Sequence, residues 1–362
     1  MDKTKLIEKL KNYSENYQKK LKHGEPLQFL VYSDKYGIDF DYSSSVKNQP
    51  FHIASIGKML TATIIGILID KKIIELDELV SKYFSDQELD GLFIYEGIDH
   101  KDQVTIRHLL THTSGIADYF ESKVNADSPF VEQIMRNPDK KWVPNMLVDF
   151  ARTKQSAVGP IGQYFYSDTG YVLIGLLIEK ATSKSFSQVL DEYIFRPLEM
   201  NDSYLMFYGK PVNDTVDIAP IYFNGNEVSK LNLLSCDWAG GGIISTTRDL
   251  LRFQKAFWSG QIVSEQYIKI MSEINNKFRS GMHYGMGMME LRYEEFFFLL
   301  RGLPRPLGHS GILSTHMYYD KDDDVHLILN MGSNKLMVKS FQLLIAAQQL
   351  VRQYLKLNEP RL

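Results

Sequence analysis

The feature that most constrains the fold is an apolar run from Met59 to Ile69, interrupted only by two threonines and one glycine. A helix of this composition needs burial on nearly every side, so the run predicts a central helix. At 362 residues, the chain is long enough to bury such a helix in one large core or between two lobes. The apolar fraction of 44% and the charged fraction of 23% are those of an ordinary globular protein.

Ser55 and Lys58 stand at the start of this helix. Positions i and i+3 lie on one face of a helix, so the lysine ammonium can lie beside the serine hydroxyl. A serine hydroxyl becomes a good nucleophile when a neighbouring base takes its proton, and a partly desolvated lysine can do this. Backbone N–H groups at a helix N-terminus can also stabilise an oxyanion. The spacing therefore indicates a serine–lysine acyl-transfer enzyme, whereas the same spacing in Ser44–Lys47 lies in a polar stretch and indicates a loop.

Net charge and cysteine content exclude several classes of protein. A net charge of −3 with scattered lysine and arginine residues gives no reason to expect nucleic acid. The segment Met1–Lys9 lacks the apolar core of a signal peptide, and no apolar run reaches the ~18 residues of a membrane span. The expected location is therefore the cytoplasm by default, although a secreted form that had lost its signal would look the same. Cys236 is the single cysteine, so no internal disulfide is possible, and a small core residue is expected there.

Strand-like segments occur at both ends of the chain. They are predicted at Leu27–Tyr32, Ile38–Phe40, Tyr284–Leu291, Phe296–Leu300, Leu313–Tyr319 and Val325–Met331, the last two forming a hairpin. Helices other than the central one are predicted at Leu6–Leu21, Thr105–His112, Tyr171–Thr182, Phe186–Phe195 and Leu336–Leu355.

The predicted fold class is α+β: one antiparallel sheet built from distant segments, flanked by helices, with an inserted and mainly helical lobe. We expect residues 1–75 and 236–362 to form the sheet-containing lobe and residues 76–235 the helical lobe. The active site is expected in the cleft between the two lobes, where binding sites tend to lie.

Two further segments carry chemistry. In Tyr164–Gly170, Tyr166 can act as a proton shuttle if the neighbouring Lys58 lowers its pKa; the alternative is a packed tyrosine in a turn. In Gly308–Ile312, His309 can assist proton transfer or orient a carbonyl, and the small residues allow a substrate backbone to approach. The alternative for this second segment is a β-turn before a hairpin.

Two other patterns are better explained by structure than by chemistry. The glycine triplet Gly240–Gly242 lacks the Gly-Lys-Ser/Thr ending of a phosphate-binding loop, and Thr246 or Thr247 is expected to cap the helix that follows. His108 and His112 have a metal-ligand spacing, but Leu109 stands where a zinc protease needs glutamate. Capping and packing are therefore expected at these histidines, and no metal.

Taken in order, these pieces resemble the serine β-lactamase and penicillin-binding-protein superfamily, and within it the class C-like branch of D-Ala-D-Ala carboxypeptidases, D-aminopeptidases and esterases. The residues that carry the resemblance are Phe51–Lys58, Val104–Gly115, Tyr166–Asp168, Gly240–Asp249 and His309–Gly311. The resemblance implies a helical lobe beside an α/β sandwich with an antiparallel sheet, and it implies no metal or cofactor.

The resemblance also implies roles for individual residues. Ser55 would be the acylated nucleophile, Lys58 its proton acceptor, and Tyr166 the shuttle for the leaving group and for deacylation. His309 and Ser310 would occupy a strand motif that is often Lys-Thr-Gly, with Gly311 allowing close approach. The oxyanion hole would be formed by the backbone N–H groups of Ser55 and Ile312.

The sequence departs from that pattern at two positions. Asp168 stands where the motif usually ends in asparagine, and a carboxylate beside Lys58 favours the ammonium form and makes the lysine a poorer base. His309 replaces the usual lysine, so the site loses positive charge and its usual attraction for a carboxylate. Arg301 or Arg305 is a candidate to restore that attraction. We therefore expect weak or absent β-lactamase activity.

The leading interpretation is a serine hydrolase that acts through a Ser55 acyl-enzyme on an ester, amide or D-amino-acid peptide bond, as a carboxypeptidase, aminopeptidase or esterase. The alternatives are a transacylase of the same family and a non-catalytic binding or sensor relative. The expected partner is a small-molecule or peptide substrate, and the sequence does not define the oligomeric state. Substrate loops are expected within Asp118–Val143, Met206–Leu234 and Met289–Arg305, where Glu294–Leu300 is either an acyl pocket or a core or edge strand.

Overall fold

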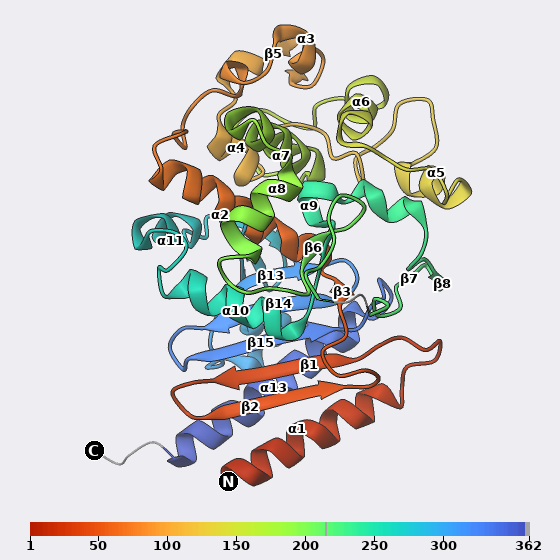
Figure 1. Cartoon of the computed structure of the whole chain (residues 1–362). Helices are drawn as coiled ribbons and strands as arrows, with labels where there is room; N and C mark the ends of the chain where they lie inside the picture. Colours follow the sequence, from red (N-terminus) through yellow and green to blue (C-terminus); the bar gives the residue numbers. More distant parts are fainter. Residues whose placement is uncertain (214–215, 359–362) are drawn as a thin grey trace.

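The computed structural model describes residues 1–213 and 216–358, and an antiparallel sheet built from both ends of the chain dominates it (Figure 1). In sheet order its strands are β10 (Asn276–Arg279), β11 (Met282–Tyr284), β12 (Met289–Leu291), β13 (Leu307–Gly311), β14 (Thr315–Asp320), β15 (Val325–Asn330), β1 (Gln28–Ser33) and β2 (Ile38–Ser43). The N-terminal hairpin joins the C-terminal strands where β1 pairs with β15, with Leu30 opposite Ile328.

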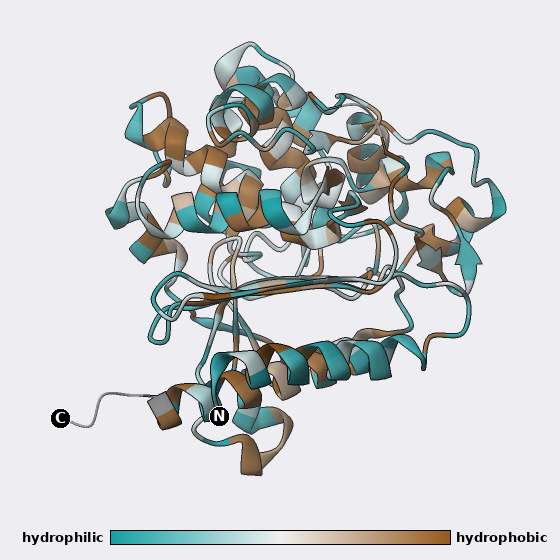
Figure 2. Cartoon of the chain, turned by 60° about the horizontal axis from the view of Figure 1, so that its bottom comes forward, coloured by the Kyte–Doolittle hydropathy of each residue, from teal (hydrophilic) through white to brown (hydrophobic). Residues whose placement is uncertain are grey.

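Successive side chains of a strand point to opposite faces of the sheet, and both faces are covered here. Phe29 and Val31 belong to one apolar cluster with α1 (Lys3–Gln18) and α13 (Met337–Asn358), whereas Leu30 belongs to the larger cluster on the other face. Figures 1 and 2 show α1 and α13 together along one face of the sheet, with most helices on the opposite side. Figure 2 also shows the more hydrophilic side of α1 turned away from the sheet.

Most of the helices and short strands outside the large sheet contribute buried side chains to the larger cluster. The helices are η1 (Ala54–Ile56), α2 (Gly57–Asp70), η2 (Val80–Lys82), α3 (Asp86–Leu89), η3 (Lys101–Gln103), α4 (Ile106–Leu110), α5 (Phe130–Arg136), α6 (Pro144–Lys154), α7 (Asp168–Thr182), α8 (Phe186–Leu190), η4 (Asp191–Phe195), η5 (Asn232–Cys236), α9 (Trp238–Gly241), α10 (Thr247–Trp258) and α11 (Glu265–Met271). The short strands are β3 (Phe51–His52), β9 (Ile243–Ser245) and β6 (Tyr204–Leu205) in one sheet, and the pairs β4 (Ile94–Tyr95) with β5 (Ile98–Asp99) and β7 (Tyr222–Phe223) with β8 (Asn226–Glu227).

The central helix is confirmed. Every residue of α2 from Gly57 to Leu68 is buried, as the apolar run after Ser55 requires. Helix–helix packing is close enough that a Cβ on Gly66 would lie 2.3 Å from the Tyr267 ring. Helix α2 therefore lies in the core of the protein, and Ser55 lies in η1, immediately before α2.

Several smaller predictions are confirmed. Thr246 caps α10 by accepting from the backbone N–H of Asp249, and His108 closes a capping box with Thr105 at the start of α4. Cys236 is buried. The hairpin of β14 and β15 and the closing helix α13 lie where expected.

Other predictions are wrong. The segment 284–291 is not one strand, because β11 ends at Tyr284 and β12 begins at Met289, with Gly287 at positive φ between them. The segment 296–300 is not a strand either: it lies in α12 (Tyr293–Phe296) and η6 (Phe298–Leu300). Along α1 the predicted apolar stripe fails at Tyr13, which is 40% exposed, and the helix ends at Gln18.

None of the helices in the described part of the chain combines the length and apolar character needed to cross a membrane. Residues 214–215 of the predicted substrate loop, and residues 359–362 of the predicted sheet lobe, lie outside the described residues. The division into lobes at residues 75 and 236 stays a prediction.

Candidate active site

Ser55 and Lys58 meet as the spacing predicts. Lys58 Nζ lies 3.2 Å from Ser55 Oγ, and the Lys58 side chain is completely buried. Since η1 leads directly into α2, both side chains leave the same face of one turn. The serine is partly exposed and the lysine is enclosed behind it.

The Lys58 ammonium has two further partners. It forms a close ion pair with Asp168 at the start of α7 and donates to the carbonyl oxygen of Gly240, 2.8 Å away. The Asp168 side chain is 18% exposed, so this pair lies at the edge of the buried region. The carboxylate of Asp168 therefore compensates the buried positive charge, as predicted for aspartate at this position.

Tyr166 is another side chain in contact with Ser55. Its hydroxyl is hydrogen-bonded to Ser55, and Lys58 Nζ lies 5.1 Å from the centre of its ring. Burial, with the nearby Asp168 carboxylate, raises the pKa of Tyr166 well above its ordinary value. The condition set from the sequence for a proton shuttle, a pKa lowered by Lys58, is therefore not met, and Tyr166 is a neutral phenol that can donate a proton.

Strand β13 carries the segment Gly308–Gly311, so the alternative of a β-turn there is wrong; the turn follows, between β13 and β14. The His309 side chain is buried, and its Nδ1 lies 2.8 Å from the Ser310 carbonyl oxygen, which is consistent with an N–H donated from Nδ1. Burial, with the Lys58 charge, lowers the pKa of His309 to about 3, so the imidazole is neutral. The Ser310 hydroxyl turns the other way, to His316 and Tyr318.

Two glycines allow the strand and the α9 segment to approach the serine turn. A Cβ on Gly311 would lie 2.7 Å from Ala54 Cβ, and a Cβ on Gly241 would lie 2.6 Å from the Ala54 carbonyl carbon. These distances are shorter than real Cβ contacts, so only glycine fits at either position. The glycine triplet is structural, as predicted, but the contact of Gly240 with Lys58 was not foreseen.

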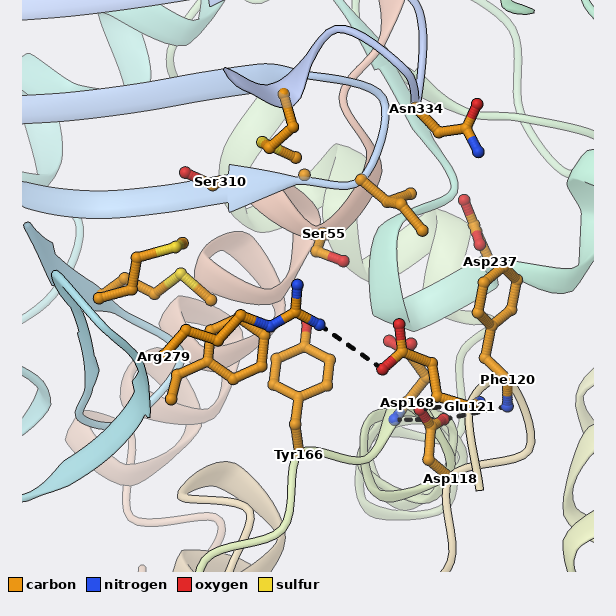
Figure 3. Close-up of a pocket in the computed structure, with 16 residues that line it drawn as sticks. Ser55, Asp118, Phe120, Glu121, Tyr166, Asp168, Asp237, Arg279, Ser310 and Asn334 are labelled. Carbon is orange, nitrogen blue, oxygen red and sulfur yellow. Dashed lines mark hydrogen bonds and ion pairs between the residues drawn. The ribbon is translucent and has the colours of Figure 1, made fainter. Parts of the chain in front are cut away.

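A cavity of about 220 Å³ opens over Ser55 (Figure 3). Its lining comprises Ser55, Asp118, Phe120, Glu121, Tyr166, Asp168, Asp237, Phe278, Arg279, Met282, Met289, Ser310, Gly311, Ile312, Asn334 and Met337. The cavity therefore brings together Ser55, Tyr166, Asp168, Ser310, Gly311 and Ile312 from the predicted site. Lys58 and His309 lie behind the lining.

One side of the cavity is acidic. Asp118, Glu121, Asp168 and Asp237 gather there, and Arg279 reaches across from β10 to Glu121 at 3.8 Å (Figure 3). Asp118 also fixes its loop, since its carboxylate accepts from the backbone N–H groups of Phe120, Glu121 and Asp168. Burial, with the nearby Asp168 charge, raises the pKa of Asp118 well above its ordinary value.

Asp237 is the least expected of these acids. Its Oδ2 lies 3.6 Å from His52 Nε2, and its side chain is 25% exposed. Burial, with the Asp168 charge, raises its pKa to about 7. Near neutral pH this carboxyl therefore changes its charge inside the cavity.

An aromatic cluster supports Tyr166 from behind. The His112 ring lies 4.2 Å from the Tyr166 ring and 4.6 Å from the Tyr284 ring, between centres, and His112 Nδ1 accepts from the backbone N–H of Ser167. Burial, with the Lys58 charge, lowers the pKa of His112 well below its ordinary value, which keeps it neutral and able to accept. Packing and hydrogen bonding thus explain His112, as predicted.

Some predicted substrate contacts lie elsewhere. Arg305 pairs with Glu294, and neither Arg301 nor Arg305 lines the cavity; the arginine at the site is Arg279. The acyl-pocket alternative for 294–300 is also wrong, since none of those residues lines the cavity. Of the expected substrate loops, Asp118–Val143 and Met289–Arg305 each contribute to the lining, and the described part of Met206–Leu234 contributes nothing.

The comparisons with known proteins agree with this geometry. Residues 34–349 match the model of the family described as Beta-lactamase. Penicillin-binding protein 4* of Bacillus subtilis (strain 168) is 30% identical over 251 residues, which are 64% of this chain and 51% of that protein. The chain therefore spans about half the length of this curated relative.

Solved structures show the same fold. D-amino acid amidase from Ochrobactrum anthropi SV3, complexed with D-phenylalanine, has a TM-score of 0.79 at 22% identity, over 96% of this chain and 99% of that chain. EstCE1, described as a hydrolase with promiscuous acyltransferase activity, has a TM-score of 0.76 at 15% identity, over 97% and 99% of the two chains. The predicted α+β fold class and the predicted resemblance are both confirmed.

Proposed function

This chain belongs to the Beta-lactamase family, and we propose that it is a serine hydrolase in which Ser55 forms an acyl-enzyme with a substrate that carries a positive charge. The proposal rests on the contact of Ser55 Oγ with Lys58 Nζ at 3.2 Å, at the base of a cavity. The Tyr166 hydroxyl is hydrogen-bonded to the same serine. A nucleophile, a proton acceptor and a proton donor at one point are what acyl transfer needs.

In the acylation step Ser55 Oγ bonds to the carbonyl carbon of the substrate, and the Ser55 proton passes to Lys58 Nζ. The ion pair with Asp168 favours the charged form of Lys58, so neutralising Asp168 should assist the transfer of the Ser55 proton.

Tyr166 acts on the leaving group. Its raised pKa keeps the phenol protonated, so it donates its proton to the departing nitrogen or oxygen as the carbonyl–leaving-group bond breaks. The Lys58 ammonium then returns a proton to Tyr166. Deacylation reverses the sequence: a water oxygen bonds to the acyl carbon, its proton passes through Tyr166 and Lys58, and Ser55 Oγ recovers a proton as the acyl bond breaks.

The oxyanion would be held by the backbone N–H groups of Ser55 and Ile312. Both residues line the cavity, and the close approach of Gly311 to Ala54 brings the end of β13 to the serine turn. We assign His309 and Ser310 supporting roles, since the His309 imidazole is buried behind the lining and the Ser310 hydroxyl is bonded within the sheet.

The charge of the cavity selects the substrate class. Lys58 pairs with Asp168 and Arg279 with Glu121, so neither cation is free to bind a carboxylate, and the raised pKa of Asp118 favours its neutral form. Asp237, whose pKa of about 7 leaves it partly ionised at neutral pH, is then the carboxyl that attracts an ammonium group. An ester, an amide or a D-amino-acid peptide with a free amine fits this field, whereas a β-lactam carries a carboxylate. The similarity to a D-amino acid amidase supports the same substrate class.

A transacylase is the second candidate. Phe120, Phe278, Met282, Met289, Ile312 and Met337 line the cavity with apolar surface. Such a lining favours binding of an alcohol or amine acceptor that competes with water, and EstCE1 is described as having acyltransferase activity.

The test is a panel of matched substrates with Ser55→Ala as the control. We expect hydrolysis of D-amino-acid amides and esters with a free amine, slower hydrolysis of their N-acetylated forms, and weak or absent hydrolysis of a cephalosporin. Adding an alcohol or amine and measuring the new ester or amide separates a transacylase from a hydrolase. Faster turnover of the cephalosporin than of every amine-bearing substrate would contradict the proposed charge selection.

A further inference from the structure

The loop between β12 and β13 presents three apolar side chains to solvent. Phe297 is 51% exposed, Phe298 is 65% exposed and Leu299 is 67% exposed. None of the three lines the catalytic cavity. Contiguous exposed apolar residues of this kind mark an interaction site, because isolated exposed residues are common and runs of them are not.

The loop is held firmly beneath this apolar tip (Phe297–Leu299). Tyr293 is fully buried at its start, and the Phe296 ring lies 5.4 Å from the Phe341 ring of α13, between centres. On the other side of the tip, Leu300 and Leu303 pack against the cluster under α1 and α13. The base of the tip is therefore anchored in the α1–α13 layer.

Cations without a carboxylate partner lie beside the tip and where α1 meets α13. Within the described ranges, Arg301, Lys20 and Lys339 form no ion pair with a carboxylate. Arg301 directly follows η6, and Lys339 lies in the first turn of α13 with its Nζ 3.2 Å from the Lys20 carbonyl oxygen. The end of α1, the start of α13 and the tip therefore belong to one region.

The acidic residues of the loop do not cancel this charge. Glu294 pairs with Arg305, and Glu295 pairs with Lys277 and contacts His283. Glu25, near the end of α1, is buried and accepts from the backbone N–H groups of Lys22 and His23. The region thus combines an exposed apolar tip with neighbouring side chains of net positive charge.

We propose that this region docks the protein on the surface of a membrane that contains anionic lipid. The tip enters the boundary between headgroups and acyl chains, and the cations face the lipid phosphates. A second copy of the chain is a poor occupant, because a symmetric contact would bring the same cations against each other. Val338, 72% exposed one turn before Phe341, extends the apolar contact.

Sedimentation with lipid vesicles tests the proposal on the full chain. We expect binding to vesicles of phosphatidylcholine mixed with phosphatidylglycerol, weaker binding to phosphatidylcholine alone, and release by salt. Phe298→Ser and Leu299→Ser should each lower the partition coefficient about tenfold. Arg301→Gln and Lys339→Gln should each lower it about fivefold.

Ile98→Ser is the matched control, since Ile98 is 58% exposed on β5 and lies outside this region. It should bind vesicles like the parent chain. All variants should keep the parent melting temperature and hydrolytic activity, because the substituted side chains are exposed and outside the cavity. No binding to the mixed vesicles, or equal binding by Phe298→Ser and the parent, would overturn the proposal. A dimer in solution that Phe298→Ser dissociates would overturn it as well, in favour of contact between copies.

Discussion

Replacing Tyr166 by phenylalanine separates proton donation from packing. The ring contacts remain, because the Tyr166 ring lies 4.2 Å from His112 and 5.1 Å from Phe278, between centres, and phenylalanine has the same ring. Only the hydroxyl and its hydrogen bond to Ser55 are lost. The free energy of unfolding should therefore change by about 1 kcal/mol or less.

The catalytic effect should depend on the leaving group. A departing amine needs a proton, so losing a general acid should lower kcat/KM for an amide about 10³-fold, which is about 4 kcal/mol of transition-state stabilisation. A nitrophenolate leaves without a proton, so kcat/KM for the matched nitrophenyl ester should fall less than about tenfold. We choose kcat/KM because it reports the acylation step and excludes deacylation.

The assay compares the amide and the nitrophenyl ester of one acyl group on the parent chain and on Tyr166→Phe. Equal losses on both substrates would refute proton donation to the leaving group and would assign Tyr166 to activation of Ser55. A large fall in melting temperature would show that the hydroxyl serves packing, against the ring contacts above.

The remaining predictions concern the charges around Ser55. Asp168→Asn should raise the rate of fluorophosphonate labelling of Ser55 at neutral pH about tenfold, because the carboxylate no longer stabilises the Lys58 ammonium; an unchanged rate would argue against that restraint. Lys58→Met should lower the free energy of unfolding by about 3 kcal/mol by leaving Asp168 without its cation, and adding Asp168→Asn should recover most of the loss in thermal melts. The pKa of Asp237 is about 7 in the folded chain and lower in the unfolded chain, so its ionisation destabilises the fold increasingly from about pH 4 to about pH 7. Asp237→Asn should accordingly stabilise the chain by about 2 kcal/mol at pH 8 and have no such effect at pH 4, as chemical denaturation at the two pH values will show. Glu121→Gln should lower kcat/KM for amine-bearing substrates about fivefold and leave N-acetylated ones unchanged; equal effects on both would remove Glu121 from charge selection.

Much of the fold could be predicted because its strongest signals are local. The apolar run of α2 is buried along nearly its whole length, and β1 and β15 are buried almost throughout because both faces of the sheet are covered. Strand β13 is not predicted by its own residues, because Gly308–Gly311 has little intrinsic preference for a strand and is held there by pairing with β12 and β14. Only the family resemblance places His309 and Ser310 in a strand motif. The run 296–300 is predicted as a strand because its composition is apolar and aromatic. In the structure it is helical and several of its side chains are exposed.

Part of the candidate site could likewise be predicted from the sequence, and part could not. Ser55 and Lys58 share one turn, so spacing alone indicates them, whereas the family resemblance is what points to Asp168 and favours a role for Tyr166 in the same short segment. Arg279 and Asp237 come from segments without a motif and reach the cavity only through the tertiary fold. The direction of the Tyr166 pKa shift was equally hidden, because burial outweighs the neighbouring lysine and burial is not a property of sequence spacing.

Intact-mass spectrometry after exposure to a fluorophosphonate shows whether Ser55 is an activated nucleophile. We expect one adduct per chain on the parent protein and none on folded Ser55→Ala, because the Lys58 and Tyr166 contacts activate that hydroxyl alone. The absence of an adduct on the folded parent chain would contradict an activated Ser55 and favour a non-catalytic relative. An adduct that persists in Ser55→Ala would place the reactive nucleophile elsewhere.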